Sequence, residues 1–345
     1  MQASDKVTLQ EEAATPVTLT RLGFGGAPIG NLYRRVEEED AQAALQAAYD
    51  GGVRYFDTAP QYGLGLSEGR VGRAVARFAR DGVTLSTKVG RLLEDCAPEE
   101  VTPAAFVDVP QKRFVYDYTY DGVMKSHEAS LARLGVESVD LLLVHDVDVF
   151  THGSREASDE KVRELFDGGG YRALQELKAA GRVKAIGAGV NEWQVCEKLL
   201  DLGEFDGFLL AGRYTLLEQE ALDTFLPRCV ERDVGIVNGG PFNSGILATG
   251  AVEGARYNYD FAPPEILERV RRIEAVCTDH GVRLIEAALQ FVLGHPAVKT
   301  VIPGAVTAAE VQANIDLLAR PIPAALWSDL KGADLLRQDA PTPGD

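Results

Sequence analysis

Short apolar runs and longer segments with helical periodicity alternate along this chain. Each run is rich in β-branched or other hydrophobic residues and ends in a polar or glycine-rich turn, a pattern typical of buried strands. The eight runs cover residues 21–29, 53–60, 83–90, 139–146, 183–191, 207–214, 234–242 and 299–305. Apolar residues recur with helical spacing over residues 37–50, 67–80, 121–134, 170–180, 192–201, 217–232, 264–294 with a break at Gly281, and 307–318.

Strand and helix patterns that alternate eight times predict a (β/α)8 TIM barrel with a closed parallel sheet. An open doubly wound sheet is the alternative. Its GxGxxG fingerprint is missing, because GFGGAPIG after the first run leads into the polar segment NLYRR rather than a helix. We expect one barrel domain over residues 1–345, with residues 1–16 and 339–345 as frayed tails.

Three connections between these segments are unusually long. They follow the third, fourth and seventh runs, at residues 91–118, 146–169 and 243–262. In a barrel, all connections that follow strands lie at the same end, which is where active sites are built. We therefore expect long βα loops to enclose a site at the C-terminal face of the barrel.

The composition excludes several classes of partner. The chain has 345 residues, of which 46% are hydrophobic, and its formal net charge is −17. Phosphate groups would be repelled, so neither nucleic acid nor membrane surface is an expected partner. No apolar run approaches the roughly 18 residues of a spanning helix, and the start lacks a signal-peptide pattern, so we expect a cytoplasmic protein. The four cysteines lack disulfide or zinc spacing, and no apolar stripe favours a particular oligomeric state.

Four residues with complementary acid-base chemistry fall at or just beyond the ends of three successive predicted strands. They are Asp57 and Tyr62 after the second run, Lys88 on the third and His145 on the fourth. Barrel closure points them toward one mouth. Taken singly, each residue is more typical of a turn cap, a packing residue or a core histidine. Together they form a system that can transfer a proton.

Elementary chemistry assigns a role to each of these residues. Tyrosine is a poor acid-base catalyst at neutral pH because its ordinary pKa is about 10. An adjacent ammonium favours the phenolate, and a carboxylate keeps that ammonium charged. We expect Tyr62 to exchange a proton with the substrate oxygen, Lys88 to lower the pKa of Tyr62, Asp57 to hold Lys88, and His145 to orient the substrate oxygen. None of them supplies or accepts a hydride, so a cofactor must do so.

The segments FDTAPQYG, LSTKVG and LLLVHD, which carry these residues, resemble the Asp, Tyr, Lys and His segments of the aldo-keto reductases. GAGVNEW and TVIPGAVTAAEVQANIDLL are similar to the nicotinamide-amide and adenosine-phosphate segments of that family, so the resemblance covers residues 20–320. It implies a (β/α)8 barrel that binds a nicotinamide cofactor without a Rossmann fold. DYTYDGVMKSHEASLARLGVESVDLLLVHDVD, AIGAGVNEW and PFNSGIL are most similar to the branch that contains D-threo-aldose 1-dehydrogenase and pyridoxal 4-dehydrogenase, with L-galactose dehydrogenase nearby.

The resemblance implies oxidation of a cyclic hemiacetal. The anomeric hydroxyl of L-fucose or a related aldose would lose hydride to the cofactor, which leaves a lactone, and Tyr62 would act as the base. Pyridoxal, oxidised to 4-pyridoxolactone, and L-galactose are the alternative substrates.

Two other classes of function compete with this interpretation. A metal-dependent barrel hydrolase would use His145, Asp146, Asp148 and His152 as ligands, but it leaves the phenol and the amine without a role, so we expect no metal site. A nucleotide-sensing subunit with the same fold and little turnover would leave the complete set of four catalytic residues unexplained.

The resemblance also implies a set of cofactor contacts, in which Asn191 takes the carboxamide. Many family members stack a Tyr from the end of the seventh strand on the nicotinamide, whereas this chain has Gly239 and Gly240 there, with Phe242 as the replacement. The implied contacts are Asn191, Phe242, Ser244, Gly245, Pro303, Gly304, Glu310 and Asn314.

The adenosine end of this implied site favours NAD over NADP. NADP-preferring members hold the 2′-phosphate with Lys, Ser and Arg, where this chain has Gly304, Ala305 and Glu310. A carboxylate a few ångströms from a phosphate costs on the order of a few kcal/mol before screening. Thr307 and Glu310 also form the T-x-x-E pattern of a helix capping box, which places the carboxylate where a phosphate would bind.

Aromatic residues from the long loops are expected to wall the substrate pocket. Their faces suit sugar and pyridine rings equally. The residues in question are Tyr33, Tyr116, Tyr118 and Trp193.

Overall fold

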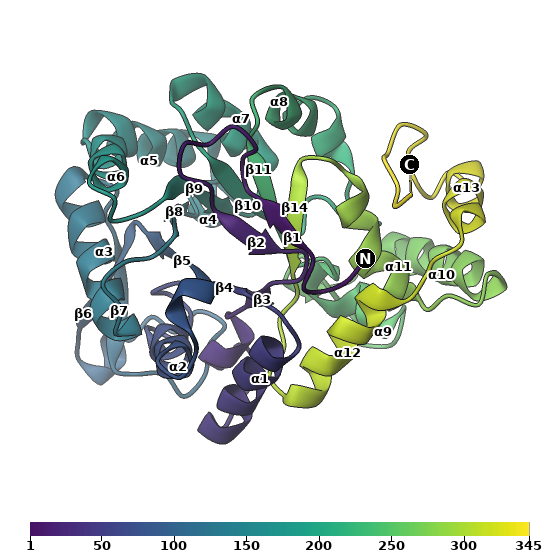
Figure 1. Ribbon diagram of the computed structural model, residues 1–345, viewed down its shortest axis with the longest axis horizontal. Helices are drawn as coiled ribbons and strands as arrows, with labels where there is room; N and C mark the ends of the chain where they lie inside the picture. The colour runs from purple at the N-terminus through teal and green to yellow at the C-terminus, as the bar shows by residue number, and fades with distance from the viewer. Residues whose placement is uncertain (345) are drawn as a thin grey trace.

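The computed structural model describes residues 1–344, and a parallel eight-stranded barrel lies at its centre (Figure 1). The strands pair in chain order, and bridges from Leu22 to Val301 and from Gly25 to Gly304 close the sheet. Each expected run overlaps one strand, so the predicted (β/α)8 barrel is confirmed. The barrel strands are β3 (Phe24–Gly25), β4 (Tyr55–Asp57), β5 (Thr84–Val89), β8 (Leu141–His145), β9 (Ala185–Val190), β10 (Gly207–Ala211), β11 (Gly235–Gly239) and β14 (Val298–Ile302).

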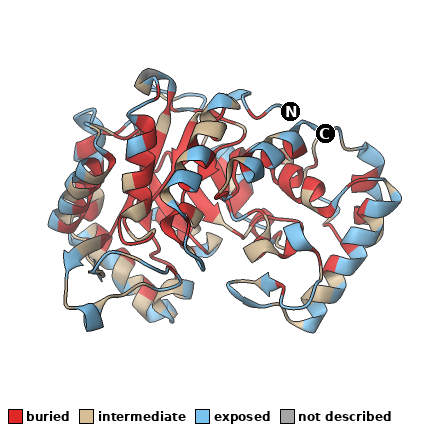
Figure 2. Ribbon diagram, turned by 90° about the horizontal axis from the view of Figure 1, so that it is seen from below, coloured by how far each residue is buried: buried red, intermediate tan, exposed pale blue. Residues whose placement is uncertain are grey.

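Helices surround the barrel and turn their buried faces toward it (Figure 2). The helix expected over 217–232 is shorter than predicted, because Glu220–Leu222 forms a separate 3-10 turn, η4. The outer helices are α1 (Glu38–Asp50), α2 (Leu66–Val75), α3 (Tyr120–Leu134), α6 (Gly170–Ala179), α7 (Trp193–Leu202), α8 (Phe225–Glu231), α10 (Pro264–Asp279), α11 (Leu284–Phe291), α12 (Ala308–Ala319) and α13 (Ala324–Gly332).

The three long connections fold into structure of their own at the carboxyl ends of the strands, on the lower side of Figure 2. The first forms a hairpin, the second two helices, and the third a short helix and a second hairpin. These elements are β6 (Arg91–Asp95), η3 (Pro98–Glu100), β7 (Lys112–Tyr116), α4 (Val149–His152), α5 (Arg155–Asp167), η5 (Asn243–Gly245), α9 (Ile246–Thr249), β12 (Arg256–Tyr257) and β13 (Asp260–Phe261).

An N-terminal hairpin, β1 (Lys6–Thr8) and β2 (Thr18–Thr20), crosses the opposite end of the barrel (Figure 1). Leu9 is 1% exposed and belongs to the apolar cluster inside the barrel. Within the expected frayed segment 1–16, the structure therefore differs around β1, where burial of Ala3 and Leu9 holds the chain, whereas residues 11, 12 and 14–16 are exposed. The C-terminal tail departs from expectation as well, since Ala340 is buried, while residue 345 lies outside the described residues.

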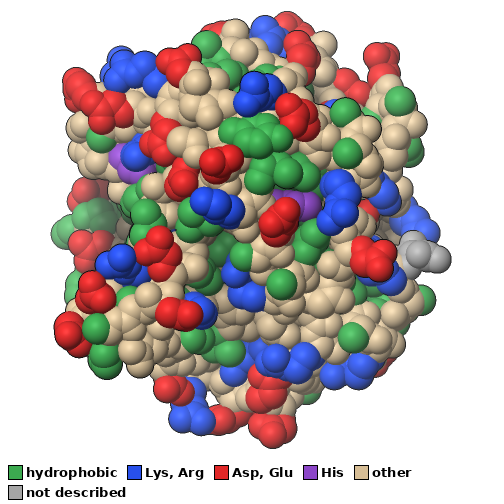
Figure 3. Space-filling model, turned by 90° about the vertical axis from the view of Figure 1, so that its left-hand side faces the viewer, with side chains coloured by type: hydrophobic (Ala, Val, Ile, Leu, Met, Phe, Trp, Pro, Cys, Tyr) green, Lys and Arg blue, Asp and Glu red, His purple; other side chains and the backbone are tan. Residues whose placement is uncertain are grey.

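The outer surface carries charges of both signs. On the face shown in Figure 3, acidic and basic side chains are interspersed with hydrophobic ones. Among residues 1–344, none of the helices combines the length and hydrophobicity needed to cross a bilayer.

Candidate active site

A buried ion pair joins the ends of β4 and β5. Lys88 Nζ donates to Asp57 Oδ2 at 2.8 Å, to Asp57 Oδ1 at 3.0 Å and to the Thr58 carbonyl at 2.9 Å. Ser86 Oγ donates to Asp57 Oδ1 at 2.7 Å. Both charged side chains are nearly inaccessible to solvent, so the charge of each is balanced mainly by the other.

Tyr62 and His145 lie beside this pair. Lys88 Nζ is 4.6 Å from the centroid of the Tyr62 ring. The Tyr62 and His145 rings meet edge to face, with their centroids 5.8 Å apart. The structure thus brings together the four residues that the sequence places on three strands.

The electrostatics of Tyr62 differ from the expectation. Burial, with Asp57 and Asp146 adding to it, raises the pKa of the Tyr62 phenol well above its ordinary value, and Arg91 opposes the shift. The expected lowering by Lys88 is not found, because Asp57 already neutralises the ammonium. Burial, together with the charges of Arg91 and Lys88, lowers the pKa of His145 well below its ordinary value. The imidazole is therefore neutral near neutral pH.

Two cavities meet at Tyr62. The first, which we call the groove, has a volume of about 430 Å³ and runs from Asp57 past the ends of β10 and β11 to Glu310. The second, which we call the pocket, has about 460 Å³ and extends from Lys88 and His145 under the β6–β7 hairpin. Leu32, Tyr62 and Tyr259 line both, so a group bound in one lies against a group bound in the other.

Most of the implied cofactor residues line the groove. Phe242, Ser244, Gly245, Gly304 and Glu310 do so, whereas Asn191 lines the pocket and Pro303 and Asn314 line neither cavity. Pro303 instead accepts the Gly25 amide through its carbonyl and helps to close the barrel, and Asn314 is buried within α12.

Three glycines line the middle of the groove. They are Gly212, Gly239 and Gly240, and a Cβ on Gly239 would lie 3.1 Å from Leu209. Phe242 lines the same wall. These glycines leave that part of the groove free of side chains, and its far end at Glu310 lies by the start of α12.

The substrate residues expected from sequence divide among different places. Tyr116 lines the pocket, but Tyr33, on the loop between β3 and α1, lines the groove. Tyr118 is fully buried behind the site, where its hydroxyl donates to the His145 carbonyl at 2.7 Å. Trp193 lines neither cavity, because it begins α7 and packs on the core.

Sequence reasoning missed several side chains that line the pocket. Arg91 directly follows the LSTKVG segment, and its position just past a strand end was the signal available. The others lie in the long connections after the strands, where Phe114 is in β7 and Phe150 in α4, and no local pattern revealed how these connections fold. The missed residues are Arg91, Phe106, Phe114, Phe150 and Tyr259.

The residues of the hydrolase alternative are engaged elsewhere. Asp146 pairs with Arg91. Asp148 caps α4 and accepts a hydrogen bond from the main-chain N–H of Asn191 at 2.6 Å. His152 Nε2 lies 2.9 Å from the Asp146 carbonyl oxygen. Within residues 1–344, no group of three or more His, Cys, Asp or Glu side chains is arranged to hold a metal ion.

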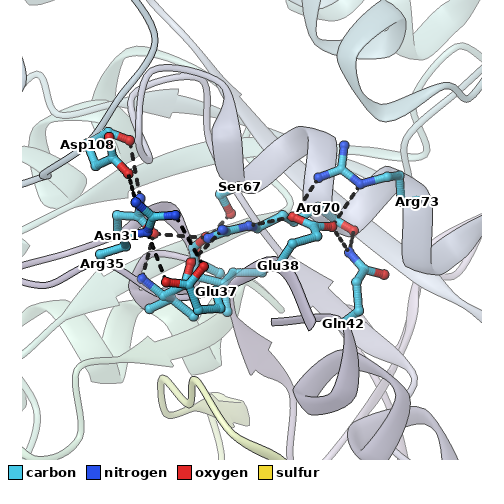
Figure 4. Close-up of polar contacts among 12 residues, drawn as sticks. Asn31, Arg35, Glu37, Glu38, Gln42, Ser67, Arg70, Arg73 and Asp108 are labelled. Atoms are coloured by element: carbon cyan, nitrogen blue, oxygen red, sulfur yellow. Dashed lines mark hydrogen bonds and ion pairs between the residues drawn. The ribbon is translucent and has the colours of Figure 1, made fainter. Parts of the chain in front are cut away.

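A polar network holds the loop that separates the two cavities (Figure 4). Arg70 of α2 donates to the carbonyls of Ile29 and Val36, each at 2.6 Å, and to Asn31 Oδ1 at 3.0 Å. Its Nε donates to Glu38 of α1 at 3.0 Å. One buried guanidinium thus anchors both ends of the segment that carries Leu32.

The comparisons with known proteins agree with this geometry. The chain is 40% identical to pyridoxal 4-dehydrogenase of Microbacterium luteolum, over 97% of this chain and 99% of that protein. It is 39% identical to D-threo-aldose 1-dehydrogenase of Pseudomonas sp, over 96% and 98%. The holo form of aldo-keto reductase AKR11C1 from Bacillus halodurans shares the fold, with a TM-score of 0.72 and 23% identity over 95% of this chain and 96% of that one.

The model of the aldo/keto reductase family matches residues 21–334, nearly the whole barrel. Aldo-keto reductases use nicotinamide cofactors. With this match and these relatives, the chain belongs to the aldo/keto reductase family and is an oxidoreductase.

Proposed function

We propose that this protein is an NAD-dependent dehydrogenase that oxidises the anomeric hydroxyl of a cyclic aldose, such as L-fucose, to a lactone. The observation that carries the proposal is the position of Tyr62, at the junction of a groove lined by glycines and a pocket with polar and aromatic walls. The similarity to D-threo-aldose 1-dehydrogenase supports this substrate class.

The residues of the groove would hold the cofactor. Phe242 would pack against the nicotinamide, and Ser244 and Gly245 would lie along the diphosphate. Asn191, which lines the pocket and accepts from Tyr259 at the junction of the two cavities, would bind the carboxamide from the pocket side. Bound there, the oxidised nicotinamide supplies the hydride acceptor.

Proton transfer would fall to the four residues Asp57, Tyr62, Lys88 and His145, which we call the tetrad. The neutral His145 would donate a hydrogen bond to the substrate oxygen, and the Tyr62 hydroxyl oxygen, once deprotonated, would take the proton from the anomeric hydroxyl. Lys88, held by Asp57, would stabilise the phenolate through the 4.6 Å contact with the Tyr62 ring. Because burial raises the pKa of Tyr62 and so favours the neutral phenol, the nearby ammonium is needed to stabilise the phenolate when it forms.

The far end of the groove supports NAD over NADP. Glu310 lines it, accepts the Val306 amide at 2.7 Å and lies 3.8 Å from Arg34. A 2′-phosphate would compete with this carboxylate for the same amide and the same guanidinium. The Thr307 hydroxyl accepts the Glu310 amide, which is one half of the expected capping box, while the Glu310 carboxylate bonds to the amide of Val306 and not to that of Thr307.

Pyridoxal oxidation is the second candidate function, and the 40% identity to pyridoxal 4-dehydrogenase favours it. The aromatic walls formed by Phe106, Phe114 and Tyr116 suit a pyridine ring as well as a sugar.

The test is a panel of L-fucose, L-galactose, other aldoses and pyridoxal, each with NAD and with NADP. We expect the highest kcat/KM for an aldose with NAD, with the lactone identified by mass spectrometry. A higher kcat/KM for pyridoxal than for every aldose would establish the second candidate. Tight NAD binding without turnover on any substrate would favour the nucleotide-sensing subunit instead.

A further inference from the structure

The pocket contains a buried guanidinium that the protein only partly satisfies. Arg91, the first residue of β6, is 4% exposed and lies over the rings of Phe114 and Tyr116, 5.0 and 5.1 Å from their centroids. Its Nη2 donates to Asp146 Oδ2 at 2.5 Å. Its Nε is buried without a partner, and within residues 1–344 its Nη1 donates no hydrogen bond to the protein. A buried donor group without an acceptor is costly, which indicates that a ligand completes it.

Asp146 connects Arg91 to the catalytic residues. Its Oδ1 accepts from Asn191 Nδ2 at 3.1 Å, and its Oδ2 lies 3.3 Å from His145 Nε2. Asp146 adopts a positive φ of 48°, and its amide donates to the Gly189 carbonyl at 2.9 Å, which directs the carboxylate to this position. A carboxylate oxygen has about two acceptor sites, so Oδ1 keeps capacity for one further donor.

The pair therefore presents a donor and an acceptor next to His145, and its two charges cancel. A hydroxyl group matches this combination because it both accepts and donates. A phenolate or carboxylate only accepts, and Asp146 would repel it. His145 Nε2 and Asp146 Oδ2 lie 3.3 Å apart, so a ligand group that binds to Asp146 lies next to one that binds to His145, as hydroxyls on adjacent carbons do.

Resting on the proposed function, we propose that Arg91 and Asp146 bind the hydroxyl on the carbon next to the reacting carbon. Arg91 donates to this hydroxyl and Asp146 accepts from it. The pair thereby selects neutral, vicinally hydroxylated hemiacetals over 2-deoxy and anionic ones.

The test compares L-fucose with 2-deoxy-L-fucose, which lacks only this hydroxyl. Loss of hydrogen bonds to a charged pair predicts that the wild-type enzyme prefers L-fucose by roughly tenfold or more in kcat/KM. In Arg91→Gln this ratio should fall close to one. The double variant Arg91→Gln/Asp146→Asn removes both charges and leaves no buried charge unpaired, so it keeps the test available if the single variant does not fold.

Arg113→Gln is the matched control. It makes the same change on the same hairpin, at a guanidinium that pairs with Glu94 and Glu100 outside both cavities. Arg113→Gln should retain the wild-type ratio of kcat/KM for the two sugars. If Arg91 served folding alone, Arg91→Gln would lower kcat/KM for both sugars and leave their ratio unchanged.

Two results would overturn the inference alone. They are equal kcat/KM for the two sugars in the wild-type enzyme, and a wild-type ratio that persists in the folded double variant. A wild-type preference for pyridoxal over L-fucose would overturn it together with the proposed function. Turnover of L-fucose without discrimination against the 2-deoxy sugar therefore separates the two failures.

Discussion

In the proposed function, the hydroxyl of Tyr62 exchanges the proton with the substrate, and the ring of this residue lies beside Lys88, whose charge is balanced by Asp57. We expect Tyr62→Phe to lower kcat by roughly 10²- to 10⁴-fold and to leave NAD affinity unchanged, because the ring remains. Stopped-flow hydride transfer and NAD titration measure the two quantities. Tyr171→Phe, on the outer helix α6, is the control. A substantial residual rate in Tyr62→Phe would remove this residue from the base role.

The pKa shifts give the pH dependence a definite sign. The pKa of Tyr62 is raised, so the phenolate fraction grows with pH throughout the neutral and alkaline range. The pKa of His145 is lowered, so this residue stays neutral over the same range and adds no opposing limb. The rate of the oxidative chemical step should therefore climb from neutral to alkaline pH. A flat single-turnover profile would contradict a phenolate base.

In the proposed function, the negative charge of Glu310 disfavours NADP. Glu310→Arg replaces repulsion of a 2′-phosphate with attraction, and we expect the ratio of kcat/KM for NADP to that for NAD to rise roughly tenfold or more. Glu310→Gln removes the charge but keeps an acceptor for the Val306 amide, so it should give a smaller rise. Parallel kinetics with both cofactors measure the ratio. An unaltered ratio in both variants would refute the repulsion argument.

At the scale of residues, the sequence sufficed where a side chain lies at the end of a regular strand. Asp57, Lys88 and His145 were placed because barrel closure fixes where strand ends point. Tyr118 was expected to line the pocket and is buried behind it, and Tyr259 was missed, because both positions depend on loop packing. Tyr259 sits at a hairpin turn with φ of 66° and donates to Asn191 Oδ1 at 3.1 Å, a contact across 68 positions that no local pattern encodes.

At the scale of elements, the same division appears between periodic segments and long connections. The helices around the barrel follow their apolar periodicity, as α1 and α12 do. The β6–β7 hairpin was expected only as a loop, because its two strands are separated by residues 96–111 and pair through contacts that are distant in sequence. Its pairing nevertheless places Arg91 opposite Tyr116 and so builds the wall of the pocket.

The loop between β3 and α1 tests how one side chain positions an element. Arg70→Gln leaves the carbonyls of Ile29 and Val36 without their donor, and we expect the free energy of unfolding to fall by about 3 kcal/mol and the KM for NAD to rise. The exposed neighbour Arg73 also pairs with Glu38, and Arg73→Gln should cost less than about 1 kcal/mol. Urea unfolding and cofactor kinetics measure both effects. Equal losses in the two variants would show that burial of Arg70 is unimportant.

At the scale of the whole molecule, the two ends of the barrel have different tasks. The tetrad, the groove and the pocket lie at the carboxyl ends of the strands, while the N-terminal hairpin covers the other end. The alternation of strands and helices predicted the barrel because it is set by periodicity and closure. The hairpin was missed because its apolar residues, Leu9, Val17 and Leu19, are scattered among polar ones, and only the open end of the finished barrel makes their burial favourable.

This separation predicts that stability and activity can be changed independently. Leu9 is 1% exposed inside the barrel, so Leu9→Ala should lower the free energy of unfolding by about 2–5 kcal/mol. The kinetic constants of the folded enzyme should stay at their wild-type values, because the cavity opens at the end remote from Tyr62. Val230→Ala, at a position 48% exposed on α8, should change stability by less than about 1 kcal/mol and serves as the control. Denaturant unfolding and steady-state kinetics measure the pair of outcomes. If folded Leu9→Ala showed a lower kcat as well as a lower free energy of unfolding, the hairpin would be coupled through the barrel to the active site.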